Sequence, residues 1–213
     1  MKSIPKSGRY LPNKLGYVTL LSLQDVMGRN GVNAVLNLAN LRSWINAYPS
    51  DTLEKHLDFA DYSAINGSLE EMYGPRGARG LAMRAGRATF DQVLRGFSAL
   101  ATMGDLTFRI LSPNARLKFG LGAIARFLSQ TSDQHITVTE HPDHFLYTVE
   151  YCSMCWGRKT QTPTCNLAVG MLQASLKWIS GGKEFSVVET QCCALGDEVC
   201  AFTIQKQPLE PEY

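Results

Sequence analysis

Several features are missing from this sequence, and each absence excludes a class of protein. No run of about 18 apolar residues occurs, so a transmembrane helix is not expected. The first 16 residues are polar and contain two prolines, so they lack the apolar segment of a signal peptide. The 21 Lys and Arg are scattered among 19 Asp and Glu, and no helix-turn-helix or zinc-finger spacing accompanies them, so nucleic-acid binding is not expected. These absences predict a cytoplasmic protein.

Motifs for nucleotide binding and catalysis are missing too. No Gly-x-Gly-x-x-Gly follows a strand-like segment, and the stretch GPRGARG at 74–80 lacks the Gly-Lys-Ser/Thr ending of a phosphate loop. His135, His141 and His144 lie close together in the sequence, but nothing assembles with them into a set of nucleophile, base and orienting group. We therefore expect no catalytic residues and favour a protein that is not an enzyme.

The length and the spacing of apolar residues predict a single α+β domain. The 213 residues, 45% of them hydrophobic, suffice for one core, and we expect a flexible lead-in over 1–16, one domain over 17–206 and a polar tail over 207–213. N-terminal helices followed by a ββαββ half predict helices packed on an antiparallel sheet of about four strands. The expected helices cover 20–41, 68–103, 112–130 and 164–179, and the expected strands cover 135–140, 144–152, 184–190 and 200–205.

Small residues are unusually dense in GPRGARGLAMRAGRATFDQVL, residues 74–94. Close packing against another helix is one interpretation. The other is a helix face that leaves room for a bulky ligand, because glycine permits close approach, with Arg84 and Arg87 at the rim for an acidic group. The other side chains that we expect to line such a ligand-binding pocket are Phe90, Leu94, Phe97, Phe127, Tyr147 and Trp178.

Three of the six cysteines lie in one C-terminal segment, VETQCCALGDEVCAF, together with a carboxylate. Because strand side chains alternate and a Gly-Asp turn reverses the chain, Glu189, Cys192 and Cys200 can converge at one end of a hairpin. Cys165, near the start of the helix expected over 164–179, is the fourth candidate ligand. Three thiolates and one carboxylate suit Zn²⁺ in a closed site, so these four residues are predicted to bind a structural zinc ion.

Cys152 and Cys155 form a CxxC pair with two further interpretations. They could be redox-active, although a thioredoxin-like pair follows a βαβ pattern rather than a hairpin strand. They could also join Cys192 and Cys200 in a site with four thiolates. Cys193 points away from Cys192 in an extended strand, and we interpret it as a small buried apolar residue.

Residues 152–204 resemble the 4-vinyl reductase domain family in five spaced elements. These are a CxxC pair, a Pro-x-Cys, a glycine in the helix that follows, a Glu-x-x-Cys and a Gly-Asp-x-x-Cys-x-Phe ending. The matching positions are Cys152 with Cys155, Pro163 with Cys165, Gly170, Glu189 with Cys192, and Gly196 through Phe202. The small-residue segment from 74 to 90 also looks like the helical part of this family.

The resemblance implies an α/β ligand-binding fold that is related to subunits of TRAPP vesicle-tethering complexes and is typically dimeric. In the phenol- and xylene-sensing bacterial activators, such a domain holds a zinc ion through cysteines and a glutamate. The spacing there is similar to that of Glu189, Cys192 and Cys200, and Cys165 falls near the remaining ligand. This chain lacks the ATPase and DNA-binding domains of those activators, so it is not expected to activate transcription.

Three functions are consistent with these patterns. The leading hypothesis is a stand-alone binding module for a hydrophobic small molecule (aromatic, tetrapyrrole or lipid-like) with a structural zinc ion. The alternative is an enzyme or accessory factor of (bacterio)chlorophyll biosynthesis that acts on the vinyl group of a porphyrin. The third is a homodimeric interaction subunit that resembles the tethering proteins.

Overall fold

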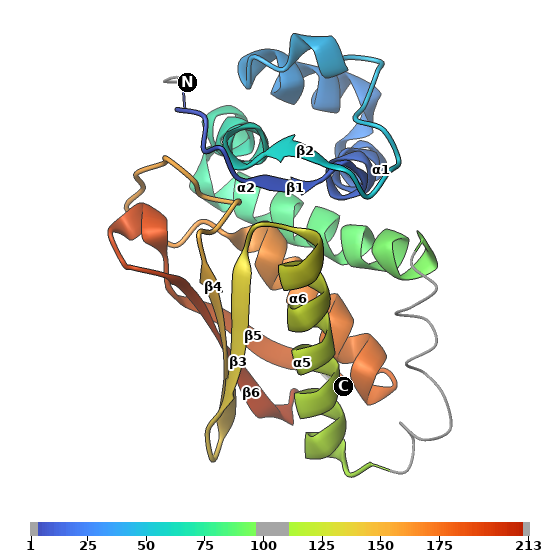
Figure 1. The fold of residues 1–213 in the computed structure, drawn as a ribbon, viewed down its shortest axis with the longest axis vertical. Helices are drawn as coiled ribbons and strands as arrows, with labels where there is room; N and C mark the ends of the chain where they lie inside the picture. Colours follow the sequence, from blue (N-terminus) through green and yellow to red (C-terminus); the bar gives the residue numbers. More distant parts are fainter. Residues whose placement is uncertain (1–3, 97–110, 211–213) are drawn as a thin grey trace.

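The computed structural model describes residues 4–96 and 111–210, which form helices and two antiparallel sheets (Figure 1). The predicted α+β class is confirmed. The helices are α1 (Asn13–Leu38), α2 (Phe59–Gly96), α5 (Pro113–Thr131) and α6 (Asn166–Ser180), and the 3₁₀ turns are η1 (Arg42–Trp44) and η3 (Cys193–Leu195). The strands are β1 (Tyr10–Pro12), β2 (Lys55–Asp58), β3 (His135–Glu140), β4 (His144–Glu150), β5 (Phe185–Gln191) and β6 (Cys200–Pro208). No helix within the described ranges combines the length and apolar character needed to cross a membrane.

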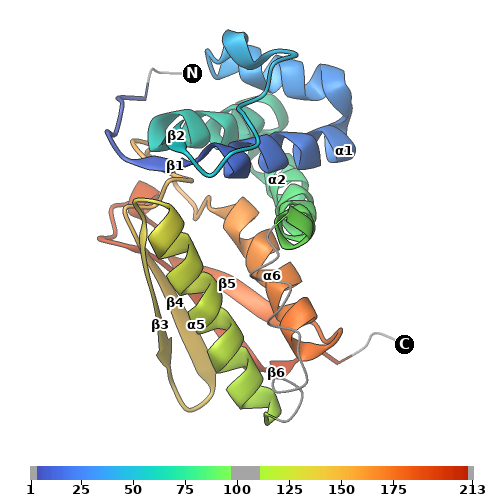
Figure 2. The same ribbon diagram turned by 45° about the vertical axis from the view of Figure 1, so that its right-hand side comes forward.

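The larger sheet has four antiparallel strands in the order β3, β4, β6, β5, and α6 connects β4 to β5. Figure 1 and Figure 2 show α5 and α6 on the same face of this sheet. Alternation along β4 buries Phe145, Tyr147 and Val149 on the side that the helices cover. Antiparallel pairing places Tyr147 opposite Phe202 of β6. The predicted ββαββ half is therefore confirmed, with β6 longer than expected.

A second layer lies across one end of this sheet, at the top of Figure 1 and Figure 2. It consists of α1, the first part of α2 and the short β1–β2 pair, in which the buried Leu11 and Leu57 are register partners. This pair was not predicted. Its first strand, Tyr10–Pro12, falls within residues 1–16, which were expected to be a flexible lead-in. Asp58 ends β2 and accepts a hydrogen bond at 2.8 Å from the N–H of Ala60 in the first turn of α2.

Glycines with positive φ bend both long helices. Gly28 in α1 has a φ of 77°, and Gly74 in α2, directly before Pro75, has a φ of 66°. Only glycine adopts this conformation without strain, so the sequence determines where each helix bends. Gly28 lies within the helix that the sequence predicts over 20–41. The expected helix start at Ser68 is wrong, because α2 already begins at Phe59 and Ser68 lies buried within it.

The small residues of α2 and α6 allow the two helices to cross at backbone contact. A Cβ atom added to Gly170 would lie 2.1 Å from the carbonyl oxygen of Met83, and one added to Gly86 would lie 2.2 Å from that of Leu167. Real Cβ atoms essentially never approach backbone oxygens so closely. Of the two interpretations of the small-residue segment, close helix packing is therefore the one that accounts for Gly86.

Candidate functional site

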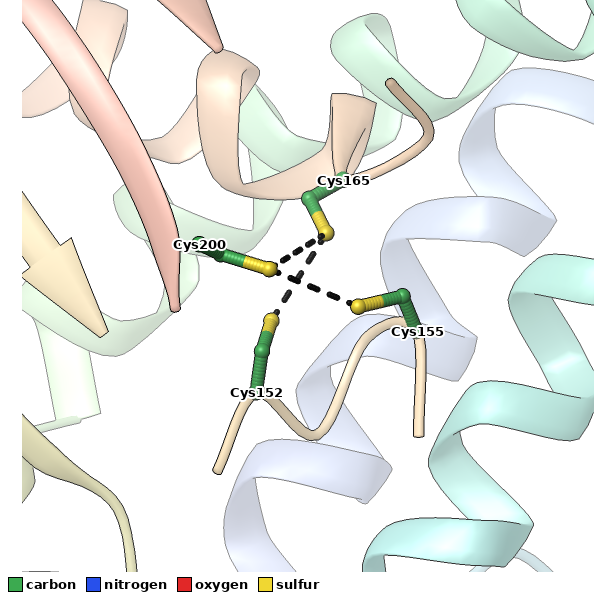
Figure 3. A group of neighbouring side chains, drawn as sticks. All are labelled: Cys152, Cys155, Cys165 and Cys200. Carbon is green, nitrogen blue, oxygen red and sulfur yellow. Dashed lines mark hydrogen bonds between the residues drawn. The ribbon is translucent and has the colours of Figure 1, made fainter. Parts of the chain in front are cut away.

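Five of the six cysteines are buried where the loop after β4, the start of α6 and the ends of β5 and β6 meet. Cys152 and Cys155 lie on the loop, and Cys165 is the N-cap residue of α6. Cys200 begins β6, where its register partner is Val149 of β4. Figure 3 shows the sulfur atoms of Cys152, Cys155, Cys165 and Cys200 pointing toward one another from these three segments.

The sulfur atoms are in contact without being bonded. The Sγ–Sγ distance is 3.6 Å between Cys152 and Cys165, 3.4 Å between Cys155 and Cys200, and 3.8 Å between Cys165 and Cys200. Two groups of four potential ligands result, and in each group the ligand atoms lie within 4.8 Å of one another. One group is Cys152, Cys155, Cys165 and Cys200, and the other is Cys165, Glu189, Cys192 and Cys200. We call the six residues together the thiol cluster.

Glu189 brings a carboxylate into this thiol cluster. It lies on β5, and 8% of the residue is exposed. Its Oε2 accepts a hydrogen bond from the N–H of Cys165 at 2.8 Å, whereas Oε1 has no hydrogen-bond partner in the described part of the chain. Burial raises the pKa of Glu189, and hydrogen bonds with Cys192 and Cys165 oppose that rise. A buried carboxylate oxygen without a partner is costly, so this position favours a proton or a cation.

The thiol groups also perturb one another. The pKa of Cys155 is lowered, chiefly by a hydrogen bond with Cys152, and the pKa of Cys200 is raised, chiefly by its hydrogen bond with the same residue. Backbone groups add donors, since the N–H of Cys193 lies 3.3 Å from the sulfur of Cys200. The N–H of Cys192 donates to Asp197 at 2.7 Å, which fixes the turn between β5 and β6. Of the thiols of Cys155 and Cys200, only that of Cys155 is therefore shifted toward the thiolate form.

The structure brings together the four residues that the sequence singled out as metal ligands, Cys165, Glu189, Cys192 and Cys200. It also brings in Cys152 and Cys155, with Cys165 rather than Cys192 completing their group of four. Cys152 and Cys155 join the thiol cluster because β4 pairs with β6, so that the loop after β4 lies next to Cys200 at the start of β6. A prediction of this strand pairing would have placed them there. Cys193 lies outside both groups and is half-buried, whereas the sequence analysis interpreted it as buried.

A small cavity lies beside the thiol cluster, between the larger sheet and the helices. Its volume is about 70 Å³, and its wall is mainly aliphatic and aromatic. The lining residues are Leu15, Phe90, Ile124, Leu128, Gln134, Ile136, Tyr147, Val149, Cys152, Met154, Ala168, Met171, Leu172, Ser175 and Phe202. Burial raises the pKa of Tyr147, so its hydroxyl stays neutral. Cys152 belongs both to the cavity wall and to the thiol cluster.

The residues proposed from sequence as a ligand pocket do not all meet at this cavity. Phe90 and Tyr147 line it, and Leu94 and Phe127 are partly buried against the core. Arg87 and Trp178 line a separate groove on the outer side of α6, and Arg84 is exposed on α2. Phe97 lies outside the described residues. The spacing of apolar residues placed the described side chains on helices or strands but could not say which side of its element each would face.

Comparison with known proteins identifies the fold but not a family. No family model matches the sequence, and no curated protein matches it. A variant of Tt H-NOX is similar to it at 14% identity and a TM-score of 0.61, with 95% of this chain and 99% of that chain covered. An H-NOX protein studied for the function of heme distortion is 15% identical, with a TM-score of 0.60 and with 95% of this chain and 98% of that chain covered. The H-NOX protein from S. oneidensis in the Fe(II)NO state is 10% identical, with a TM-score of 0.58 and with 94% of this chain and 100% of that chain covered.

These comparisons correct two predictions. The resemblance to the 4-vinyl reductase domain family, and with it the relation to TRAPP subunits, is contradicted, because the similar solved structures are H-NOX proteins and no family model matches. The prediction of a structural Zn²⁺ cofactor is also wrong, because similar structures are described as heme proteins. The interpretation as a chlorophyll-biosynthesis enzyme loses its basis with the family resemblance. At 10–15% identity, the similarity establishes an H-NOX-like fold alone.

Heme itself does not fit the residues of this chain. The sequence contains four histidines, His56, His135, His141 and His144, and all of them fall within the described residues. None of them lines the cavity as residues 4–96 and 111–210 define it. The cavity of about 70 Å³ is also several-fold smaller than the roughly 300 Å³ at the lower end of typical ligand pockets. The core as described therefore offers neither a histidine ligand nor room for a macrocycle.

Proposed function

We propose that this chain is a binding module for a small neutral apolar molecule. The observation that carries the proposal is the cavity between the helices and the larger sheet, with aliphatic and aromatic side chains over most of its wall. The H-NOX-like fold supports the same conclusion by analogy, since the similar structures include a protein crystallised with NO on iron. Because no histidine of the described ranges lines the cavity, the ligand here is one that binds by shape and apolar contact.

The energetic cost of the cavity supports this proposal. Protein interiors are packed as densely as organic crystals, and voids larger than a water molecule are few. At about 24 cal/mol per Å³, a void of about 70 Å³ costs roughly 1.7 kcal/mol of folding stability. Filling this space with one larger side chain would recover much of that cost. A cavity that persists at this cost is best explained by an occupant.

The size and chemistry of the wall limit that occupant. An apolar cavity of about 150 Å³ accepts benzene or xenon, so one of about 70 Å³ accepts a molecule of a few heavy atoms at most without rearrangement. Two of the polar side chains on the wall are already engaged in hydrogen bonds. Ser175 donates to the carbonyl oxygen of Leu172 at 2.8 Å, and Gln134 accepts from Ser153 at 2.8 Å. An ionic or strongly polar ligand would therefore find few partners.

Xenon is a direct probe of this proposal. In ¹H–¹³C methyl spectra of the reduced full chain, xenon at a few atmospheres is expected to shift the Ile124, Ile136 and Leu172 methyl signals in a saturable manner. Ala168→Leu, which fills the cavity from α6, is expected to abolish those shifts and to raise the thermal midpoint or leave it unchanged. Ala174→Leu introduces the same side chain on the same helix but faces the outer groove. This control should keep the xenon response.

Two outcomes would contradict the proposal: no saturable shift at any of the three residues, or equal shifts in the wild type and Ala168→Leu.

The expected homodimer and cytoplasmic location belong to the same proposal and have their own tests. Light scattering at a monomer mass would contradict the dimer. Fractionation of the source cells would test the location.

A further inference from the structure

We propose that the thiol cluster binds two thiophilic metal ions, bridged by the sulfur atoms of Cys165 and Cys200. One ion would take Cys152 and Cys155 as its remaining ligands, and the other would take Glu189 and Cys192. The two groups of four potential ligands each satisfy the requirement of a four-coordinate ion, and they overlap in two sulfurs. The two ions would then be the centres of two coordination tetrahedra that share one edge, the line between the sulfur atoms of Cys165 and Cys200. The inference is independent of the proposed apolar ligand.

The sulfur–sulfur distances match this coordination. A tetrahedral ion about 2.3 Å from each sulfur holds neighbouring sulfurs about 3.8 Å apart. The shared edge between Cys165 and Cys200 measures 3.8 Å, and the edges from Cys152 to Cys165 and from Cys155 to Cys200 measure 3.6 and 3.4 Å. A disulfide needs about 2.05 Å, so these contacts have the spacing of co-ligands rather than of bonded pairs.

Glu189 indicates that the first group of four thiols cannot be the whole site. An ion bound only by cysteines would leave this buried carboxylate with Oε1 unpaired. Its other oxygen is fixed by the N–H of Cys165, so the carboxylate cannot turn away to solvent. A second ion next to Cys192 supplies the missing partner. Conversely, an ion in the glutamate-containing group alone would leave Cys152 and Cys155 unused within 3.6 Å of its ligands.

Charge balance also favours two ions. The five cysteines and one glutamate of the thiol cluster carry six negative charges when all are deprotonated. Two divalent ions neutralise four of these charges, whereas one ion neutralises two. The remainder is offset by the N-terminal end of α6 at Cys165 and by the N–H of Cys193 at 3.3 Å from the bridging sulfur of Cys200. Soft thiolates with one carboxylate are ligands for soft or borderline ions rather than for Mg²⁺ or Ca²⁺.

Cadmium provides the test, because ¹¹³Cd reports its ligands directly. The reduced, metal-stripped full chain is titrated anaerobically with ¹¹³Cd²⁺, and the thiolate charge-transfer absorbance and native mass are followed. We expect the absorbance to saturate at two ions per chain and two ¹¹³Cd resonances with resolved coupling through the shared sulfurs. Saturation at one ion, or two uncoupled resonances, would overturn the proposal. The wild-type protein alone gives this answer, so it does not depend on the folding of any variant.

Variants then assign the two positions. Cys155→Ser and Cys192→Ser should each reduce the stoichiometry from two ions to one and leave different ¹¹³Cd resonances. Cys193→Ser is the matched control, because this half-buried thiol is adjacent in sequence but belongs to neither group, and it should retain two ions. If Cys155→Ser still binds two ions, the bridged arrangement is wrong.

Discussion

At the scale of single residues, Asp58 joins two segments through one buried carboxylate. Its Oδ1 accepts from the N–H of Ala60 at 2.8 Å and from the N–H and hydroxyl of Ser7 at 3.1 and 2.9 Å, and Oδ2 accepts from the N–H of Gly8 at 3.3 Å. Burial by itself raises the pKa of Asp58, but these hydrogen bonds outweigh it and the net pKa is lowered. The N-terminal segment and the start of α2 therefore depend on the ionised form.

The first prediction is that Asp58→Asn destabilises the protein in a pH-dependent manner. Because the pKa is lowered in the folded state, its contribution is complete above the unfolded pKa of about 3.9 and is lost as the pH falls through the folded value. We expect a loss of about 1 to 2 kcal/mol in the free energy of unfolding at pH 7, which shrinks below pH ~3.9. Urea unfolding at both pH values is the measurement.

Asp25→Asn, which removes an exposed carboxylate from α1, is the control for this experiment. It should change the free energy of unfolding by less than about 0.5 kcal/mol at either pH. If the Asp58→Asn difference is as large at pH ~2.5 as at pH 7, the ionised carboxylate is not what holds the segments together.

At the scale of elements, the crossing of α2 and α6 is the most sharply defined contact. Gly86→Ala and Gly170→Ala each place a methyl group against a backbone oxygen, at 2.2 Å from that of Leu167 and 2.1 Å from that of Met83. Backbone atoms cannot yield as a flexible side chain can, so the helices must separate. We expect each substitution to cost more than about 3 kcal/mol of unfolding free energy or to prevent folding. Thermal unfolding and soluble yield are the readouts.

Gly80→Ala is the matched control on α2. A Cβ at this position would meet no atom within 4 Å, so the gain in helix propensity is the main effect. We expect this substitution to be neutral or to stabilise the protein by up to about 1 kcal/mol. A Gly170→Ala protein as stable as Gly80→Ala would show that the helices do not cross at backbone contact.

The elements also show how far the sequence allows prediction. The sequence predicted α5 closely, because Ser112 caps it and Pro113 is its first residue. It also predicted β4 closely, because buried and partly buried residues alternate along this strand. β1 and β2 were missed because they are only three and four residues long and show no period. The proximity of Glu189, Cys192 and Cys200 was local enough to infer from one hairpin. The role of Cys152 was not, because its contact with Cys165 depends on how β4 and α6 pack.

The cavity was beyond prediction for a physical reason. Its wall takes residues from α1, α2, α5, α6 and three strands, so its volume is what remains after all of them have packed. Phe90 and Tyr147 were correctly named as wall residues because both are large and lie on buried faces. Trp178 was equally large, yet it faces the outer groove, since a difference of one position along α6 changes the side that a residue reaches.

At the scale of the whole molecule, the chain has an H-NOX-like fold, but the cavity that its described residues line has no histidine to bind heme. The fold alone does not assign a function, which depends on the residues at the site. We predict that hemin added to the reduced, metal-free protein forms no stoichiometric complex with a shifted, sharpened Soret band. Ile136→His, which places a histidine on the cavity wall, should still fail to bind hemin, because room is lacking as well as a ligand. The double variant Ile136→His/Phe90→Ala enlarges the space and is the arm in which partial binding is expected. A one-to-one Soret complex of the wild type would mean that the core opens to admit the macrocycle, and that the cavity of about 70 Å³ does not limit what this chain can bind.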